Sequence, residues 1–385
     1  MFGIFKRGIA VVGVSLLLAA CQVIPDGGNV QTTGPVTQTP DMPDEAVLPT
    51  DTERHRVALL VPMSGENSAV GQSIANATTM ALLDTGAENL RITTYDTNTG
   101  AAAATARAVS DGNALILGPL LRDNVGAVLG QARPAEVPLI TFSNDTSVAR
   151  PDVFVMGHVP EQSVSRTVNF AIDQGARNFA ALAPQGEYGD RAIAALRSVA
   201  EARGARVTQV ERFARNNTSI ISAASRLNAA GGFDTVLIGD GARLAAMAAG
   251  ELKDAGNALP SIIGTELWSG EASLASTPEM RGAWFSAVPD ERYRQFAQSY
   301  ETRFGGQPYR LSTLGYDSVL LTLRITRDWQ PGTTFPIRRL LDDGGFIGLD
   351  GAFRFRSDGL SERMMEVRQV GDTTVSTVDP APARF

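Results

Sequence analysis

Four short polar clusters follow apolar runs in this sequence, and their side chains are the groups best suited to bind a small molecule. Hydroxyl and amide groups, with the backbone N–H groups of a helix start, suit the carboxylate of a ligand. An aromatic ring or a carboxylate opposite them suits an apolar or cationic group. The candidate ligand-binding residues are Ser64, Ser143, Asn144, Thr146, Tyr188, Glu266 and Trp268. Each residue alone is more often a helix cap or turn residue, so the shared pattern carries the hypothesis.

Catalytic and metal chemistry have little support in the residue types. The two histidines, His55 and His158, have no second histidine or thiolate near them in sequence, so a zinc site is not expected. No phosphate-binding loop, dinucleotide fingerprint or nucleophile elbow occurs. With 34 basic and 41 acidic residues, the chain lacks the basic surface of a nucleic-acid-binding protein. We therefore expect a non-enzymatic protein with no catalytic residue, no metal, no cofactor and no nucleic-acid partner.

The only cysteine, Cys21, follows a basic pair, an apolar stretch over 8–18 and two alanines. This order predicts a signal peptide over 1–20. A membrane-spanning anchor is a weaker alternative because the continuous apolar run is only about eleven residues, against the roughly 20 that a bilayer requires. A cysteine directly after Leu-Ala-Ala resembles the bacterial lipobox, and that resemblance implies that Cys21 is lipidated and tethers the protein to a membrane. An ordinary secretory signal with a chance cysteine is the other reading.

Short apolar runs alternate with helical patterns over most of the chain. Such alternation predicts parallel sheets built from right-handed strand–helix–strand units, and the two successive series predict two Rossmann-like lobes joined by a multi-strand hinge. The clusters that open this section stand where strands end, which is where ligands bind in such sheets. The predicted parts are a disordered, proline- and glycine-rich tether over 21–54, a first lobe over 55–157 and 288–333, a second lobe over 158–287 and 334–375, and a flexible tail over 376–385.

Three segments carry a family resemblance. Residues 57–83, with Pro62-Met63-Ser64-Gly65 and Val70-Gly71-Gln72, resemble the opening of type I periplasmic binding proteins of the branched-chain amino-acid class. Gly186-Glu187-Tyr188-Gly189-Asp190 is similar to that family's entry into the second lobe, and 346–359 resembles its closing segment. The resemblance extends from residue 56 to about 372. It implies a two-lobed fold that clamps a solute between the lobes.

Within that superfamily, the segment Gly118-Pro119-Leu120-Leu121-Arg122-Asp123-Asn124-Val125 looks most like the lipoprotein activators of penicillin-binding proteins. Amino-acid carriers generally place a serine in this loop to hold the carboxylate of the ligand, whereas leucine, arginine and aspartate stand here. Residues 143–147 remain able to act as a second carboxylate-binding loop. The best-known activators carry a large helical domain before the binding-protein domain, and only the tether stands in its place here.

The resemblance to the activators implies a periplasm-facing lipoprotein that regulates peptidoglycan synthesis by binding a penicillin-binding protein, a peptidoglycan synthase. Gln22 after the lipidated cysteine resembles the sorting pattern for the outer membrane. The alternative function is a periplasmic solute-binding protein of an ABC transporter for branched-chain or related amino acids. In that case an amino-acid-like ligand would lie between Ser143, Thr146, Tyr188 and Glu266.

Overall fold

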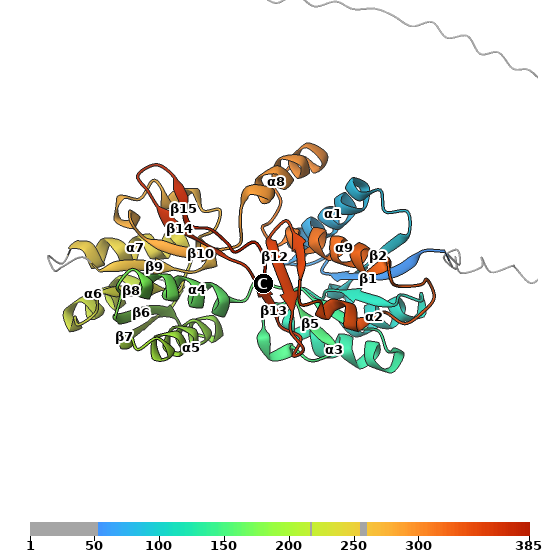
Figure 1. Cartoon of the computed structure of the whole chain (residues 1–385), viewed down its shortest axis with the longest axis horizontal. Helices are drawn as coiled ribbons and strands as arrows, with labels where there is room; N and C mark the ends of the chain where they lie inside the picture. Colours follow the sequence, from blue (N-terminus) through green and yellow to red (C-terminus); the bar gives the residue numbers. More distant parts are fainter. Residues whose placement is uncertain (1–52, 216–217, 255–259) are drawn as a thin grey trace, which may run out of the picture. The chain divides into compact units, whose positions relative to one another are not determined.

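The structure is a computed structural model of the whole chain, and it describes residues 53–215, 218–254 and 260–385 (Figure 1). Strands and helices follow the predicted alternation closely. The strands are β1 His55–Val61, β2 Leu90–Asp96, β3 Leu115–Leu117, β4 Leu139–Thr141, β5 Val153–Val155, β6 Asn178–Pro184, β7 Arg206–Phe213, β8 Thr235–Ile238, β9 Ser261–Gly264, β10 Trp284–Ala287, β11 Phe346–Gly348, β12 Gly351–Phe355, β13 Ser361–Arg363, β14 Glu366–Val370 and β15 Val375–Asp379. The helices are α1 Ser68–Thr85, α2 Ala101–Ser110, α3 Arg122–Ala132, α4 Pro160–Asp173, α5 Glu187–Ala202, α6 Ser219–Ala230, α7 Ala242–Asp254, α8 Glu291–Phe304 and α9 Ser312–Thr326.

Each of the two predicted lobes contains its own large sheet. The first sheet has the order β2-β1-β3-β4-β5 and is parallel throughout. The second has the order β15-β14-β10-β9-β8-β6-β7, in which the five strands from β10 to β7 are parallel and β14 and β15 are antiparallel. The parallel parts of both sheets share one winding order, so the α/β prediction of two Rossmann-like lobes is confirmed, with an antiparallel edge added to the second.

Strand β1 shows why the central strands are continuously apolar. Val57, Leu59 and Val61 pack into a core that α1 and α9 cover, whereas Ala58 and Leu60 pack on the opposite face against α2 and α3. Because successive side chains point to opposite faces, a strand covered on both sides must be apolar at every position. Strand β6 behaves in the same way in the second lobe, with α6 and α7 on one face and α4 and α5 on the other.

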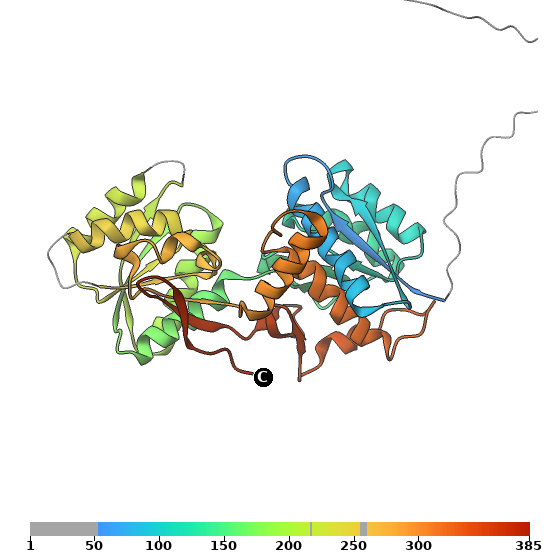
Figure 2. The same cartoon turned by 90° about the horizontal axis from the view of Figure 1, so that it is seen from above.

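Besides the C-terminal tail described below, three segments cross between the lobes: 156–159 between β5 and α4, 288–290 between β10 and α8, and 364–365 between β13 and β14 (Figures 1 and 2). A buried ionic cluster ties these crossings together. The carboxylate of Asp350 accepts hydrogen bonds from Arg310 at 2.6 Å and Thr313 at 2.8 Å, and its Oδ2 lies 2.8 Å from Nε2 of His158. Burial alone would raise the pKa of Asp350, but Arg310 and His158 lower it. Arg363 adds a hydrogen bond to the carbonyl of Met156 at 2.7 Å.

The C-terminal quarter differs from the predicted lobe boundaries. Phe346, Phe353 and Phe355 of the β11–β12 hairpin pack in the core of the first lobe, where the Phe355 ring lies 5.3 Å from that of Phe154. The assignment of 334–375 to the second lobe is therefore wrong for this hairpin, and only β14 and β15 join the second sheet. The hairpin belongs to the lobe whose core its aromatic side chains fill. The order of elements along the chain does not reveal which lobe that is.

The predicted flexible tail, 376–385, is also corrected by the structure. Its first residues belong to β15, which pairs with β14. Asp379 forms an ion pair with Arg166 of α4 at 2.8 Å, and the terminal Phe385 ring lies under the guanidinium group of Arg354 at 4.5 Å. The segment thus runs from the second lobe to the hairpin of the first.

The predicted signal peptide, 1–20, the lipidation site Cys21 and the tether up to residue 52 lie outside the described residues. Within the described ranges, no helix combines the length and the apolar character needed to cross a bilayer. The same ranges hold no group of three or more histidine, cysteine or acidic side chains placed to bind a metal ion.

Candidate functional site

The candidate site is the pair of facing sheet edges where the parallel strands of each lobe end. In both sheets the order of strands reverses at one point, between β1 and β3 in the first lobe and between β6 and β8 in the second. Loops that leave such a switch point diverge to opposite faces of the sheet and open a crevice for ligands. The side chains at these loops therefore decide whether the crevice can hold a solute.

Arg122, the first residue of α3, places a charged group between the two lobes. Its guanidinium group lies 2.9 Å from Oδ2 of Asp145 in the same lobe and is also paired with Glu187, the first residue of α5 in the second lobe. The Asp145 side chain is only 4% exposed, whereas Arg122 is 49% exposed. Burial would raise the pKa of Asp145, but hydrogen bonds from Ser147 and the charge of Arg122 lower it. The carboxylate is therefore ionised at neutral pH.

Arg191, one turn further along α5, makes a second link between the lobes. It binds both carboxylate oxygens of Glu161 at 2.6 and 2.7 Å and donates to the backbone carbonyl of Asn144 at 2.8 Å. Glu161 belongs to α4 of the second lobe, so the Asn144 carbonyl supplies the contact to the first. We call Arg122, Asp145, Glu187, Arg191 and Glu161 the interlobe latch. Two of its contacts cross between the lobes: the ion pair of Arg122 with Glu187 and the hydrogen bond of Arg191 to the Asn144 carbonyl.

The predicted ligand residues of the first lobe serve their own loops. Ser64 donates to Asp96 at 2.6 Å, and the Ser143 hydroxyl accepts from the backbone N–H of Asp145 at 3.1 Å. Asn144 is exposed and contributes its carbonyl to the latch, and Thr146 starts a short 3₁₀ turn. Ser64 and Ser143 thus stabilise the loops beside the crevice, and ligand contact by these four residues remains a prediction.

In the second lobe, the structure brings Tyr188 and Glu266 together. The Tyr188 hydroxyl donates to Thr265 Oγ1 at 2.8 Å or to Glu266 Oε1 at 3.1 Å, and the guanidinium group of Arg215 lies 5.4 Å from its ring centre. Burial and the neighbouring Glu266 carboxylate both raise the pKa of Tyr188. The phenol therefore stays protonated.

Glu266 is the least satisfied group of this cluster. Burial raises its pKa to about 7. Its Oε2 atom is buried and accepts no hydrogen bond within the described residues, because the Ser163 hydroxyl beside it donates to the carbonyl of Ser286 at 2.7 Å. Buried polar atoms of native proteins usually have a partner, so Oε2 is an exception among the described residues.

Trp268 does not extend into the crevice, and its predicted role there is wrong. Its ring is fully buried in the core of the second lobe, 5.7 Å from that of Phe285, and its N–H donates to the carbonyl of Asp240 at 2.8 Å. Gly264 makes room for it, since a Cβ at that position would lie 2.3 Å from the ring. The N–H of a buried tryptophan usually has a hydrogen-bond partner, and here that partner lies inside the lobe.

The sequence offered no signal for the latch as a unit. Arg122 and Glu187 stand in segments that carry the family resemblance, but 65 residues separate them. Arg191 and Asn144 are 47 residues apart. Single charged residues at helix starts are common, so only the approach of the two lobes reveals that these groups are partners.

The comparisons with known proteins agree with this fold. A family model described as "Periplasmic binding protein" matches residues 55–374. The chain belongs to this family. Its members and the similar structures below are described as binding proteins and activators.

Two curated relatives share parts of this periplasmic binding protein. An uncharacterised protein of Rickettsia prowazekii is 27% identical over 172 residues, which is 44% of this chain and 46% of that protein. The penicillin-binding protein activator LpoA of Mannheimia succiniciproducens is 29% identical over 150 residues, which is 38% of this chain and 26% of that protein. The chain thus matches less than half the length of either relative.

Solved structures of similar fold come from both functional classes. The leucine-binding protein LivK of Thermotoga maritima is 20% identical, with a TM-score of 0.61, and the match covers 84% of this chain and 97% of that one. Full-length LpoA of Haemophilus influenzae is also 20% identical, with a TM-score of 0.65, covering 86% of this chain and 59% of that one. At this level of identity the likeness shows the fold alone.

Proposed function

We propose that this periplasmic binding protein is a non-enzymatic, lipid-anchored regulator of peptidoglycan synthesis that acts by binding a penicillin-binding protein. The observation that carries the proposal is the interlobe latch. Its arginines are paired with carboxylates and a carbonyl of the chain itself at the place where a transported amino acid would need free groups. A ligand carboxylate would have to compete with Glu187 and Asp145 for Arg122.

Two further observations support this proposal. LpoA, named as a penicillin-binding protein activator, is among the relatives in sequence and in fold. The loop before Arg122 presents Leu121, 38% exposed, where a carrier would place a small polar residue. Hydrophobic side chains exposed next to fixed charges are suited to contact a protein partner.

Anchoring through lipid on Cys21 and delivery to the outer membrane are part of the same proposal. Residues 22–52 would then form the tether between lipid and fold. At roughly 3.4 Å per extended residue, about 30 residues reach at most about 100 Å. A partner in the opposite membrane would be within reach only near full extension, so the proposal favours a synthase with a large periplasmic part.

The test is to combine the purified full chain with the bifunctional peptidoglycan synthases of its own cell. We expect a complex in pull-down and a faster rate of glycan polymerisation or crosslinking by one of them. A solute-binding protein of the same fold serves as the matched control. The proposal is wrong if no synthase is either bound or stimulated.

A second candidate function is the binding of an amino acid or related solute for transport, and the Tyr188–Glu266 cluster favours it. Among the residues that the structure describes, Glu266 Oε2 is a buried acceptor without a donor, which an ammonium group would satisfy. Thermal-shift screening distinguishes the two candidates, since a ligand at 100 times its dissociation constant adds about 2.7 kcal/mol of stability. A response to amino acids that is lost in Glu266→Gln would favour transport, and a flat response would exclude it.

A further inference from the structure

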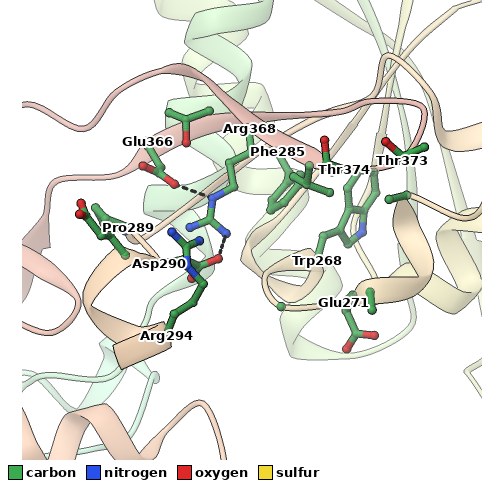
Figure 3. Close-up of a pocket in the computed structure, with 16 residues that line it drawn as sticks. Trp268, Glu271, Phe285, Pro289, Asp290, Arg294, Glu366, Arg368, Thr373 and Thr374 are labelled. Atoms are coloured by element: carbon green, nitrogen blue, oxygen red, sulfur yellow. Dashed lines mark hydrogen bonds and ion pairs between the residues drawn. The ribbon is translucent and has the colours of Figure 1, made fainter. Parts of the chain in front are cut away.

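A cavity of about 600 Å³ lies outside the crevice, beside the β14–β15 hairpin (Figure 3). Three neighbouring residues on adjacent strands of the second sheet form its floor. Phe285 of β10 lies opposite Arg368 of β14, and Arg368 lies opposite Thr377 of β15. The chain from Trp268 to Ala275 forms one wall and the start of α8 forms another. Pockets that hold small molecules or side chains typically measure about 300 to 1,000 Å³.

The buried charges on the floor leave an excess of negative charge. Arg368 donates to Glu366 at 2.6 Å, forms an ion pair with Asp290, and donates to the carbonyl of Val288 at 2.7 Å. One guanidinium group thus faces two carboxylates. Asp290 Oδ1 is buried and accepts no hydrogen bond within the described residues; Arg310 lies 3.8 Å from it and donates to Asp350.

The mouth of the cavity carries three charged side chains without a partner among the described residues. They are Glu271 next to the wall that contains Trp268, and Glu291 and Arg294 on the first turn of α8. All three are exposed. With the floor, the lining therefore has four carboxylates against two guanidinium groups. Hydroxyl groups of Thr373, Thr374 and Thr377 supply neutral hydrogen-bond partners on the hairpin side.

We propose that this cavity binds a ligand with an ammonium or guanidinium group on an aliphatic chain. The cation would lie among the carboxylates of Glu366, Glu271 and Glu291, which line the cavity. The aliphatic part would lie along Ala272, Ala275 and Pro289, which line the cavity and are exposed or half-buried. A free cationic metabolite and a lysine or arginine side chain of a partner protein share this chemistry. The proposal does not depend on the function proposed above.

The experiment titrates the purified full chain with arginine amide by isothermal titration calorimetry at pH 7.5 and low salt. Citrulline amide, which has the same shape without the side-chain charge, is the matched control ligand. We expect saturable one-site binding of arginine amide, weakening with salt, and no binding of citrulline amide. No saturable binding of arginine amide, or equal binding of both, would overturn the proposal.

Charge variants locate the site. Glu271→Gln and Glu291→Gln should each weaken binding by roughly two- to fivefold, the usual effect of one exposed charge pair. Arg294→Ala should strengthen it by a similar factor because a like charge leaves the mouth, which a general loss of structure cannot mimic. Glu88→Gln, an exposed carboxylate of the first lobe, and Glu266→Gln in the crevice should leave the affinity unchanged. Binding that is insensitive to Glu271 and Glu291, or lost in Glu266→Gln, would contradict the site.

A capped tripeptide, acetyl-Ala-Arg-Ala-amide, distinguishes the two sources of the cation. Tighter binding of the tripeptide than of arginine amide would identify a segment of a partner protein as the ligand, since backbone contacts add to the side chain. Equal or weaker binding of the tripeptide would identify a free small cation. Either result supports the cavity as a cation site.

Discussion

Removal of the two latch arginines is the sharpest test of how the lobes are held. The double variant Arg122→Ala/Arg191→Ala removes the ion pair with Glu187 and the hydrogen bond to the Asn144 carbonyl, the two contacts of the latch that cross between lobes. Arg122 and Glu187 are both about half exposed, so solvent screening limits that pair to about 0.5–1 kcal/mol. The charge-assisted bond of Arg191 adds about 1.5–2 kcal/mol. A total of about 2–3 kcal/mol corresponds to a change of roughly 30- to 150-fold in the ratio of bridged to separated lobes.

Pulsed electron paramagnetic resonance measures this ratio directly. Cys21 is the only native cysteine, so Cys21→Ser with Glu88→Cys and Glu201→Cys places one spin label on each lobe at exposed positions. We expect a longer or broader distance distribution in the double variant. The control is Arg133→Ala/Arg203→Ala, which also removes two arginines. Arg133 pairs with Asp152 inside the first lobe and Arg203 pairs with Asp173 inside the second, so neither ion pair crosses between the lobes. If both double variants leave the distribution unchanged, the latch does not hold the lobes together.

The remaining predictions concern the hinge and the second core. Asp350→Asn should lower the free energy of unfolding by about 3–5 kcal/mol in urea titrations, because it leaves Arg310 without its counter-charge and changes the hydrogen-bond partner of His158; a loss under 1 kcal/mol would contradict the cluster's role. Burial lowers the pKa of His158 below its ordinary value of 6.5, so the unfolded chain binds more protons and stability should fall as pH drops below about 6.5. This group should contribute at most about 1.4 kcal/mol per pH unit to the slope of the unfolding free energy against pH, and His158→Gln should remove that contribution. Parallel pH profiles of the two proteins would refute the assignment. Gly264→Ala should cost about 1–3 kcal/mol by pushing Trp268 out of its place, measured as a shift of the urea midpoint, and Gly239→Ala, where a Cβ would meet its nearest neighbour at 3.6 Å, is the matched control.

Much of the fold follows from local patterns in the sequence. Val57 to Val61 and Phe179 to Ala183 are apolar at every position, which only a strand covered on both faces tolerates, and both are interior strands of their sheets. The spacing of Tyr293, Phe296 and Tyr300 predicted a helix with one apolar face, and α8 buries Phe296 and Tyr300 on that face. Strand β10 and helix α4 had no such clear pattern, and neither was predicted. Periodicity and turn residues act over a few positions, so they determine elements and their order.

Only the tertiary structure decided the parts that concern function. The sequence by itself determined that polar residues stand at the carboxyl ends of strands. It did not determine that Trp268 turns into the core through the space left by Gly264, or that Arg122 and Glu187 meet across the crevice. It also assigned the aromatic hairpin over 346–355 to the wrong lobe. Charge pairs such as Arg122–Glu187, which are 65 positions apart, form only when the sheets and hinge segments bring the two residues together, and no local pattern in the chain encodes that approach.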